Sequence, residues 1–176
     1  MKRSSLVSRF LAVSACVFMS LLATRTDAAG GTVRTLRAPD QRIQSFEPPS
    51  AWERAADPPS SLVLGVWSHR DGGRITLAAD RVASGTVAGR VFDDSRKSLV
   101  SQGWSLGKVD RAPNGARVLV EATLDHGRRI ARQAYIVDGG FVYVITMVAP
   151  AEQAADRSRD FEDTVATLKL GAVEKR

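Results

Sequence analysis

Two histidines, His69 and His126, are the side chains of this 176-residue chain that could act as bases near neutral pH. Each stands beside turn-forming residues, in "HRDGG" and "DHGRR", so a polar role at a turn explains both. A serine hydrolase would need one histidine beside a serine nucleophile, with Asp71 or Asp125 orienting the imidazole. The sequence has no G-x-S-x-G motif to present such a serine. We therefore assign no catalytic residue, and keep a small hydrolase using His69 or His126 as an alternative.

Two further motifs lack the partners that their chemistry needs. Ser105 and Lys108 have S-x-x-K spacing, in which a lysine could deprotonate a serine, but the accompanying S-D-N and K-T-G elements are absent. Asp93 and Asp94 are neighbours on a predicted helix, so their side chains diverge, and no His or third acid is spaced to complete a metal site. The sequence therefore predicts no metal ligand and no cofactor site.

A small basic cluster contains Arg128, Arg129 and Arg132. Strand neighbours alternate between faces, so Arg128 and Arg132 can share a side, with Arg129 on the other. Such a patch could bind an anion, although a solvated sheet edge explains it more simply. Nucleic-acid binding would need a larger positive excess and exposed stacking aromatics, whereas Trp67 and Trp104 fall at core positions. We expect no nucleic-acid partner.

The first 28 residues have the plan of a secretory signal peptide. A basic head with Lys2 and Arg3 precedes an apolar run over residues 10–23, and small residues follow at Ala28 and Ala29. Loss of this segment would remove four basic residues and one acidic residue, so the formal net charge would fall from +6 to +3. Much of the apparent basicity therefore belongs to the signal.

The apolar run is too short for a permanent membrane span. Between Arg9 and Arg25 a helix would cover about 22 Å, against about 30 Å of hydrocarbon. Cys16 follows Val13-Ser14-Ala15, as in a lipidation box, but the apolar run continues beyond it, whereas a lipoprotein usually begins with polar residues. We expect export through the Sec pathway to the periplasm or the medium, with lipidation of Cys16 as the alternative. Cleavage after Ala28 would leave a chain without any thiol.

The hydrophobic content of 44% and the charged content of 25% are ordinary for one globular domain. Residues 29–42 are predicted to be a flexible linker, residues 43–170 the domain, and residues 171–176 a polar tail. Near the start of the domain, "RIQSFEPP" predicts a short edge strand, and Trp52 an aromatic plug at the sheet margin.

Hydrophobic periodicity predicts the remaining elements. A spacing of three and four predicts one helix over residues 86–102, with Ser84 as N-cap and Gly103 at its end. A second helix follows from the stripe Ala154, Ser158, Phe161, Val165 and Leu168. Alternation predicts strands at residues 61–69, 74–82, 104–111 and 116–124, and two more in the stretch "IARQAYIVDGGFVYVITMVA", with turns between them.

The last of these strands carries apolar side chains on both sides. Phe141, Tyr143 and Ile145 point one way, while Val142 and Val144 point the other, so neither face is suited to water. The strand must therefore lie inside the sheet, with a helix over each face. The predicted fold class is α/β, or α+β: an α/β/α sandwich with a central antiparallel sheet flanked by two main helices.

The order of these motifs resembles the PsbP-like superfamily over residues 43–170. The resemblance rests on the pattern F-x-P-P-x-x-W from Phe46 to Trp52, the hairpin "RQAYIVDGGFVYVITM", and the helix "FEDTVATLKL". The superfamily includes extrinsic photosystem II proteins, a Ran-binding nuclear import factor, and bacterial envelope proteins of the DcrB type. Its members share a fold more than a function, so we transfer no functional residue.

The resemblance implies a non-catalytic binding or assembly module, here in the bacterial cell envelope, with an envelope protein as the expected partner. The contact surface is expected at the sheet edge near Trp52, or at the turns with His69 and His126. A carrier for a small apolar or anionic ligand, bound beside the helix at residues 86–102, is the alternative.

The N-terminal processing can be tested by the intact mass of the protein isolated from its host. We expect the mass of a chain that begins at Ala29, because the small residues at this position suit signal peptidase. A mass that fits an acylated chain beginning at Cys16 would contradict this cleavage site and indicate a lipoprotein instead.

Overall fold

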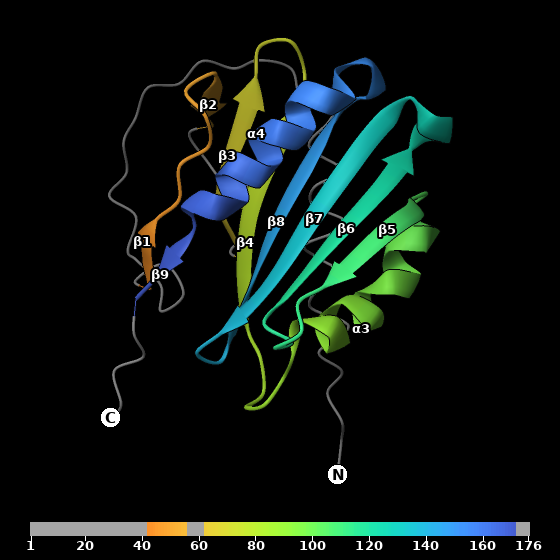
Figure 1. Ribbon diagram of the computed structural model, residues 1–176. Helices are drawn as coiled ribbons and strands as arrows, with labels where there is room; N and C mark the ends of the chain where they lie inside the picture. The colour runs from red at the N-terminus through yellow and green to blue at the C-terminus, as the bar shows by residue number, and fades with distance from the viewer. Residues whose placement is uncertain (1–41, 56–61, 172–176) are drawn as a thin grey trace.

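The computed structural model describes residues 42–55 and 62–171, and it confirms the predicted sandwich (Figure 1). A seven-stranded antiparallel sheet has the order β2-β3-β4-β8-β7-β6-β5, and β1 and β9 form a separate two-stranded sheet. The strands are β1 Ile43–Ser45, β2 Trp52–Arg54, β3 Val63–His69, β4 Arg74–Arg81, β5 Ser105–Arg111, β6 Arg117–Leu124, β7 Arg129–Asp138, β8 Phe141–Pro150 and β9 Lys169–Leu170. The helices α3 Ala88–Ser101 and α4 Ala154–Thr167 pack on opposite faces of the large sheet. The predicted signal peptide, most of the predicted linker and the predicted tail beyond Gly171 lie outside the described residues.

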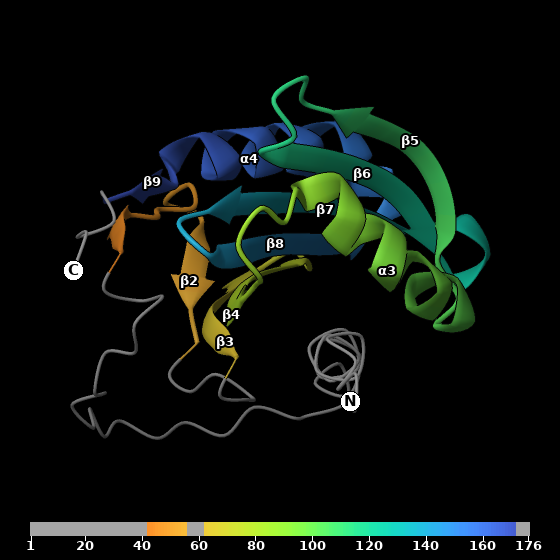
Figure 2. The same cartoon turned by 90° about the horizontal axis from the view of Figure 1, so that it is seen from below.

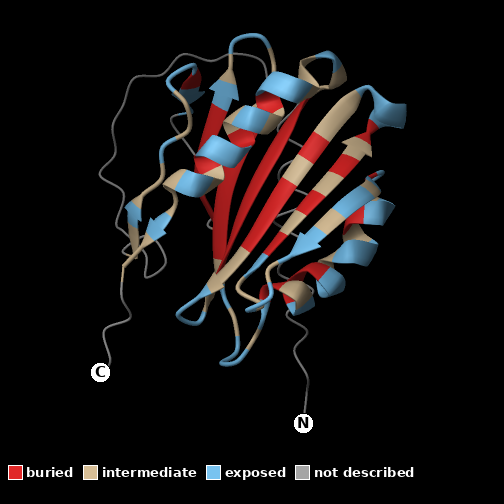
Figure 3. Ribbon diagram, in the orientation of Figure 1, coloured by how far each residue is buried: buried red, intermediate tan, exposed pale blue. Residues whose placement is uncertain are grey.

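The strand β8 is the centre of this arrangement, between β4 and β7. Val142 and Val144 belong to the core beneath α3, whereas Tyr143 and Ile145 belong to the core beneath α4. All four are at most 5% exposed. Figure 3 shows burial along nearly all of β8 and at alternate positions of β6. The prediction of a strand covered on both faces is therefore confirmed.

The helix α3 lies over β5, β6 and β7 (Figure 2). Its Phe92 ring meets the Tyr135 ring edge-on, with centroids 5.7 Å apart. The prediction of Ser84 as its N-cap is wrong, because the helix begins after Val87 and has no side-chain cap. The Gly115 carbonyl accepts the Ala88 N–H at 2.9 Å and replaces a cap.

The helix α4 is rotated relative to the predicted stripe. Phe161 is buried as expected, but Arg157 and Thr164 are its other buried residues, whereas Val165 is only partly covered. A buried arginine was not expected from periodicity, which favours apolar residues on the packed face. Its burial is possible because Asp160 accepts a hydrogen bond from its guanidinium at 2.5 Å.

The two edges of the large sheet discourage pairing with other strands. At one edge, β5 is largely exposed and bears the ion pair Lys108–Asp110 at 2.9 Å. Its register with β6 shifts between Leu106 and Val109. At the other edge, β2 has only three residues. Short, charged or irregular edges are the usual protection of exposed sheet margins.

The segment "RIQSFEPP" forms a short strand, as predicted, but this strand is not at the edge of the large sheet. Instead, β1 pairs with β9.

A buried hydrogen-bond chain joins two strands beneath α3. The Tyr135 hydroxyl donates to the Gln133 side-chain carbonyl at 2.7 Å, and the Gln133 amide donates to the Thr146 hydroxyl at 3.0 Å. Burial raises the pKa of Tyr135, because an ionised phenol would lack water around it, and a hydrogen bond with Ser95 only partly offsets this.

The variant Tyr135→Phe should lower the free energy of unfolding by about 1–3 kcal/mol, because the Gln133 acceptor loses its buried donor. The raised pKa adds a second readout. Stability from the neutral hydroxyl is present below about pH 10 and is lost as the pH rises further, since only the unfolded chain ionises readily. Urea denaturation should show that the free energy of unfolding falls between pH 7 and pH 11, and that it falls less in the variant than in the unaltered chain. Equal stabilities and equal slopes would contradict this role.

Candidate functional site

The structure brings both histidines to one end of the large sheet. We call this surface the turn end (Figure 1). It comprises His69 at the end of β3, residues 70–73 between β3 and β4, residues 125–128 between β6 and β7, and residues 151–153 between β8 and α4. Two hydrogen bonds join the three connections. The Ala151 N–H donates to the Arg128 carbonyl at 2.9 Å, and the Gln153 side-chain amide donates to the Asp71 carbonyl at 2.7 Å.

His69 stands opposite Trp52 in the pairing of β2 with β3. Their rings meet edge-on with centroids 5.3 Å apart, and only 6% of the His69 side chain is exposed. Its Nδ1 accepts the Asp71 backbone N–H at 3.2 Å, so this nitrogen is an acceptor within the turn. The prediction that His69 lines a turn and Trp52 plugs the margin is confirmed, and the two form one packed corner.

The corner is completed by α4. The Trp52 indole N–H donates to the Asp160 carboxylate at 3.0 Å, and the Arg157 guanidinium carbon lies 5.7 Å from the Trp52 ring centroid. Arg157 also donates to Gln153 at 2.9 Å, and Gln153 donates to the Asp71 carbonyl at 2.7 Å. Charge-assisted and aromatic contacts thus tie β2, the β3–β4 turn and α4 together. Sequence periodicity did not identify this network, since Asp160 and Arg157 lie outside the predicted apolar stripe.

His126 lies in a different setting. It is exposed in the short 3-10 segment Asp125–Gly127, where Asp125 has φ of 51° and His126 has φ of 56°. Left-handed backbone at two successive residues with side chains costs on the order of 1–3 kcal/mol each, and such strain concentrates at binding and catalytic sites. The turn end therefore combines one packed histidine with one presented histidine.

The proposed triad gains no support from this geometry. Neither imidazole is hydrogen-bonded to a serine hydroxyl in residues 42–55 and 62–171. Over the same part of the chain, no group of three His, Cys, Asp or Glu side chains is placed to hold a metal ion. In addition, none of the described helices is long and apolar enough to cross a membrane.

The basic cluster is divided by the fold. Arg132 donates to Glu121 on β6 at 2.5 Å and to Glu162 on α4 at 2.7 Å. Burial alone would lower the pKa of Arg132, but its bonds to the two carboxylates outweigh this and raise it. Arg128 instead turns toward the Asp125 carbonyl, at 3.3 Å. An anion patch shared by Arg128 and Arg132 is therefore wrong, because Arg132 is already neutralised by acids distant in sequence.

The remaining motifs are held in surface ion pairs. The hydrogen bond with Asp110 raises the pKa of Lys108, which opposes a role as a base toward Ser105. Asp93 accepts a hydrogen bond from Arg111 at 2.6 Å, and Asp94 lies 3.8 Å from Arg90.

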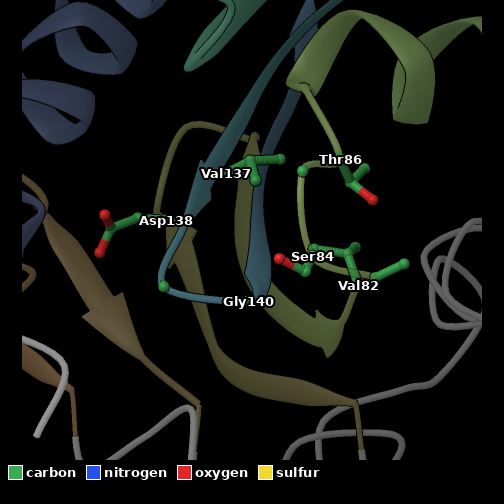
Figure 4. Close-up of a pocket in the computed structure, with 9 residues that line it drawn as sticks. Val82, Ser84, Thr86, Val137, Asp138 and Gly140 are labelled. Carbon is green, nitrogen blue, oxygen red and sulfur yellow. The ribbon is translucent and has the colours of Figure 1, made fainter. Parts of the chain in front are cut away.

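A second candidate site is an open hollow of about 560 Å³ at the opposite end of the sheet. It lies between residues 82–86, which lead into α3, and residues 137–140 of the β7–β8 hairpin. Figure 4 shows the Asp138 carboxylate directed away from Ser84 and Thr86. Arg42 holds that carboxylate outside the hollow. The hollow is thus lined by the hydroxyl-bearing Ser84 and Thr86, by glycine backbone and by apolar side chains such as Val82 and Val137, and it is open to solvent.

The sequence matches no family model and no curated protein. Among solved structures, the chain is similar to the solution structure of cyanobacterial PsbP (CyanoP) from Synechocystis sp. PCC 6803, with a TM-score of 0.54 and 13% identity. The superposition covers 81% of this chain and 98% of that one. At this identity the likeness concerns the fold, and the chain has a PsbP-like fold.

Proposed function

We propose that this chain is an exported, non-catalytic binding or assembly module of the bacterial cell envelope, of the DcrB type. The PsbP-like fold carries the proposal, and the signal-like first 28 residues support export. The mechanism is docking of a preformed surface onto an envelope protein, with no bond made or broken in the partner.

The turn end is the surface that suits this role. Two of its three connections are held in place, because the network of Trp52, Asp160, Arg157 and Gln153 fixes α4 against the β3–β4 turn. A rigid surface loses little conformational freedom on binding. It also presents charge, since the Arg70 side chain is 86% exposed.

The test is site-specific photocrosslinking in the native host. A photoreactive residue at Arg70 or at His126 should give the same discrete adduct, because both positions belong to the turn end. The matched control replaces Lys97, which is exposed on α3. An adduct of equal yield from Lys97, or none from either turn-end position, would contradict the assignment. Substituting Gln153 by Ala should lower the crosslinking yield while the chain stays folded by circular dichroism.

The hollow favours a second candidate, a carrier for a small ligand. Native mass spectrometry of protein purified from its host should then show a retained mass. The variant Ser84→Trp should abolish it by filling the hollow, whereas Ser101→Trp, at an exposed position of α3, should not. A bare protein mass, or a retained mass that survives Ser84→Trp, would contradict the carrier hypothesis.

A further inference from the structure

The segment Arg42–Glu47 crosses the end of the core beneath α4, and we call it the strap. It contains β1, which pairs with β9 through Ile43–Leu170 and Ser45–Lys169. Figure 1 shows this pair of strands beside the large sheet and next to the end of α4. The strap is therefore held by the residues that follow α4, not by a place in the large sheet.

Apolar contacts of the strap come from two of its side chains, Ile43 and Phe46. Both are partly buried against the core beneath α4. The Phe46 ring lies 5.0 Å from the Trp67 ring, and Leu170 stands opposite Ile43. The Arg42 guanidinium carbon lies 5.9 Å from the Phe141 ring centroid, which adds a cation–π contact. We call Trp67, Phe141, Thr167, Leu170 and Asp138 the strap seat.

Polar contacts fix the strap at both ends. Arg42 donates to the Asp138 carboxylate, to the Asp138 carbonyl at 2.7 Å and to the Gly171 carbonyl at 2.9 Å. Near the other end, the Ser45 hydroxyl donates to the Thr167 carbonyl at 2.7 Å, and the Glu47 N–H donates to the Thr167 hydroxyl at 3.0 Å. The seat thus forms hydrogen bonds with one basic side chain, one hydroxyl and the backbone of an extended segment.

The strap is less strongly held than the strands of the large sheet. The strands β1 and β9 have three and two residues, and their register is irregular between Ile43 and Ser45. By contrast, β8 is bonded along its length to both β4 and β7. Segments with few buried contacts and short ladders open at a lower free energy than the whole domain.

We propose that the strap seat is a recognition site for an extended segment of a partner protein, and that the strap is its built-in competitor. The strap shows which chemistry the seat accepts: a basic residue, an aliphatic residue next to it, and an aromatic residue three positions further on. The partner segment would take the place of β1 beside β9, and its backbone would form the hydrogen bonds that the strap forms now. This site is separate from the turn end and does not depend on it.

The test uses the full chain and a labelled synthetic peptide, RIQSFEPP, which repeats residues 42–49. The tethered strap acts at an effective concentration on the order of millimolar, so the unaltered chain should bind the peptide weakly. The variant Phe46→Ser weakens the strap but leaves the seat intact, and should bind at least about tenfold tighter. A peptide with Ser in place of Ile and Phe should not bind. Val87→Ser, at an exposed position beside α3, is the matched control and should leave the affinity unchanged.

Hydrogen exchange provides a readout that does not need the peptide. Amides of the strap and of β9 should exchange faster than those of β8, and faster still in Arg42→Gln, which removes the bonds to Asp138 while keeping both apolar contacts. This second variant also covers the case in which Phe46→Ser fails to fold. Adding Leu170→Asp to either variant should abolish peptide binding.

Three results would overturn the proposal. If strap amides exchange hydrogen no faster than β8 amides, the strap leaves the seat only when the whole domain unfolds. An open strap in Arg42→Gln without tighter peptide binding would show that the seat recognises nothing. A strap-exchanged dimer of the unaltered chain would assign the seat to a second copy instead of a partner. None of these results affects the photocrosslinking from the turn end.

Discussion

Burial of β8 on both faces is the constraint on which the other features depend. A strand with apolar side chains on both sides needs a strand on each edge and a helix on each face, and β4, β7, α3 and α4 meet those needs. Its two ends then become fixed points. The hairpin to β7 places Asp138 where Arg42 reaches it, and the junction to α4 places Gln153 where it bonds Asp71. The positions of the strap seat and of the turn end therefore both depend on β8.

The helix α4 connects the centre of the sheet to its margin. Phe161 anchors it over β8, while Arg157 and Asp160 join it to Trp52 on the edge strand β2. The C-terminal end of α4 then leads to β9, where the strap is bound. One helix therefore has a tightly bonded end at the turn end and a loosely covered end at the strap. Rigidity at one end and local opening at the other suit two different kinds of contact.

The layers, the strand order of the β5–β8 meander and the positions of both helices could be predicted from the sequence, because periodicity within a segment reports which side is buried. The candidate sites could not. Trp52 and Asp160 are 108 residues apart in the sequence, and Arg42 and Asp138 are 96 residues apart. Local sequence patterns therefore cannot predict either contact. Ser84 was expected to cap α3 on spacing alone, whereas a carbonyl of the distant Gly115 takes that role. The turns beside His69 and His126 were identified, but only the fold shows that they share one end of the sheet.

The outer strands of the large sheet carry a consequence for the protein in solution. A register shift and the pair Lys108–Asp110 on β5, together with the brevity of β2, deny an incoming chain the long flat row of amides that cross-β growth requires. With both described margins short, charged or irregular, folded copies should have little tendency to stack edge to edge into fibres.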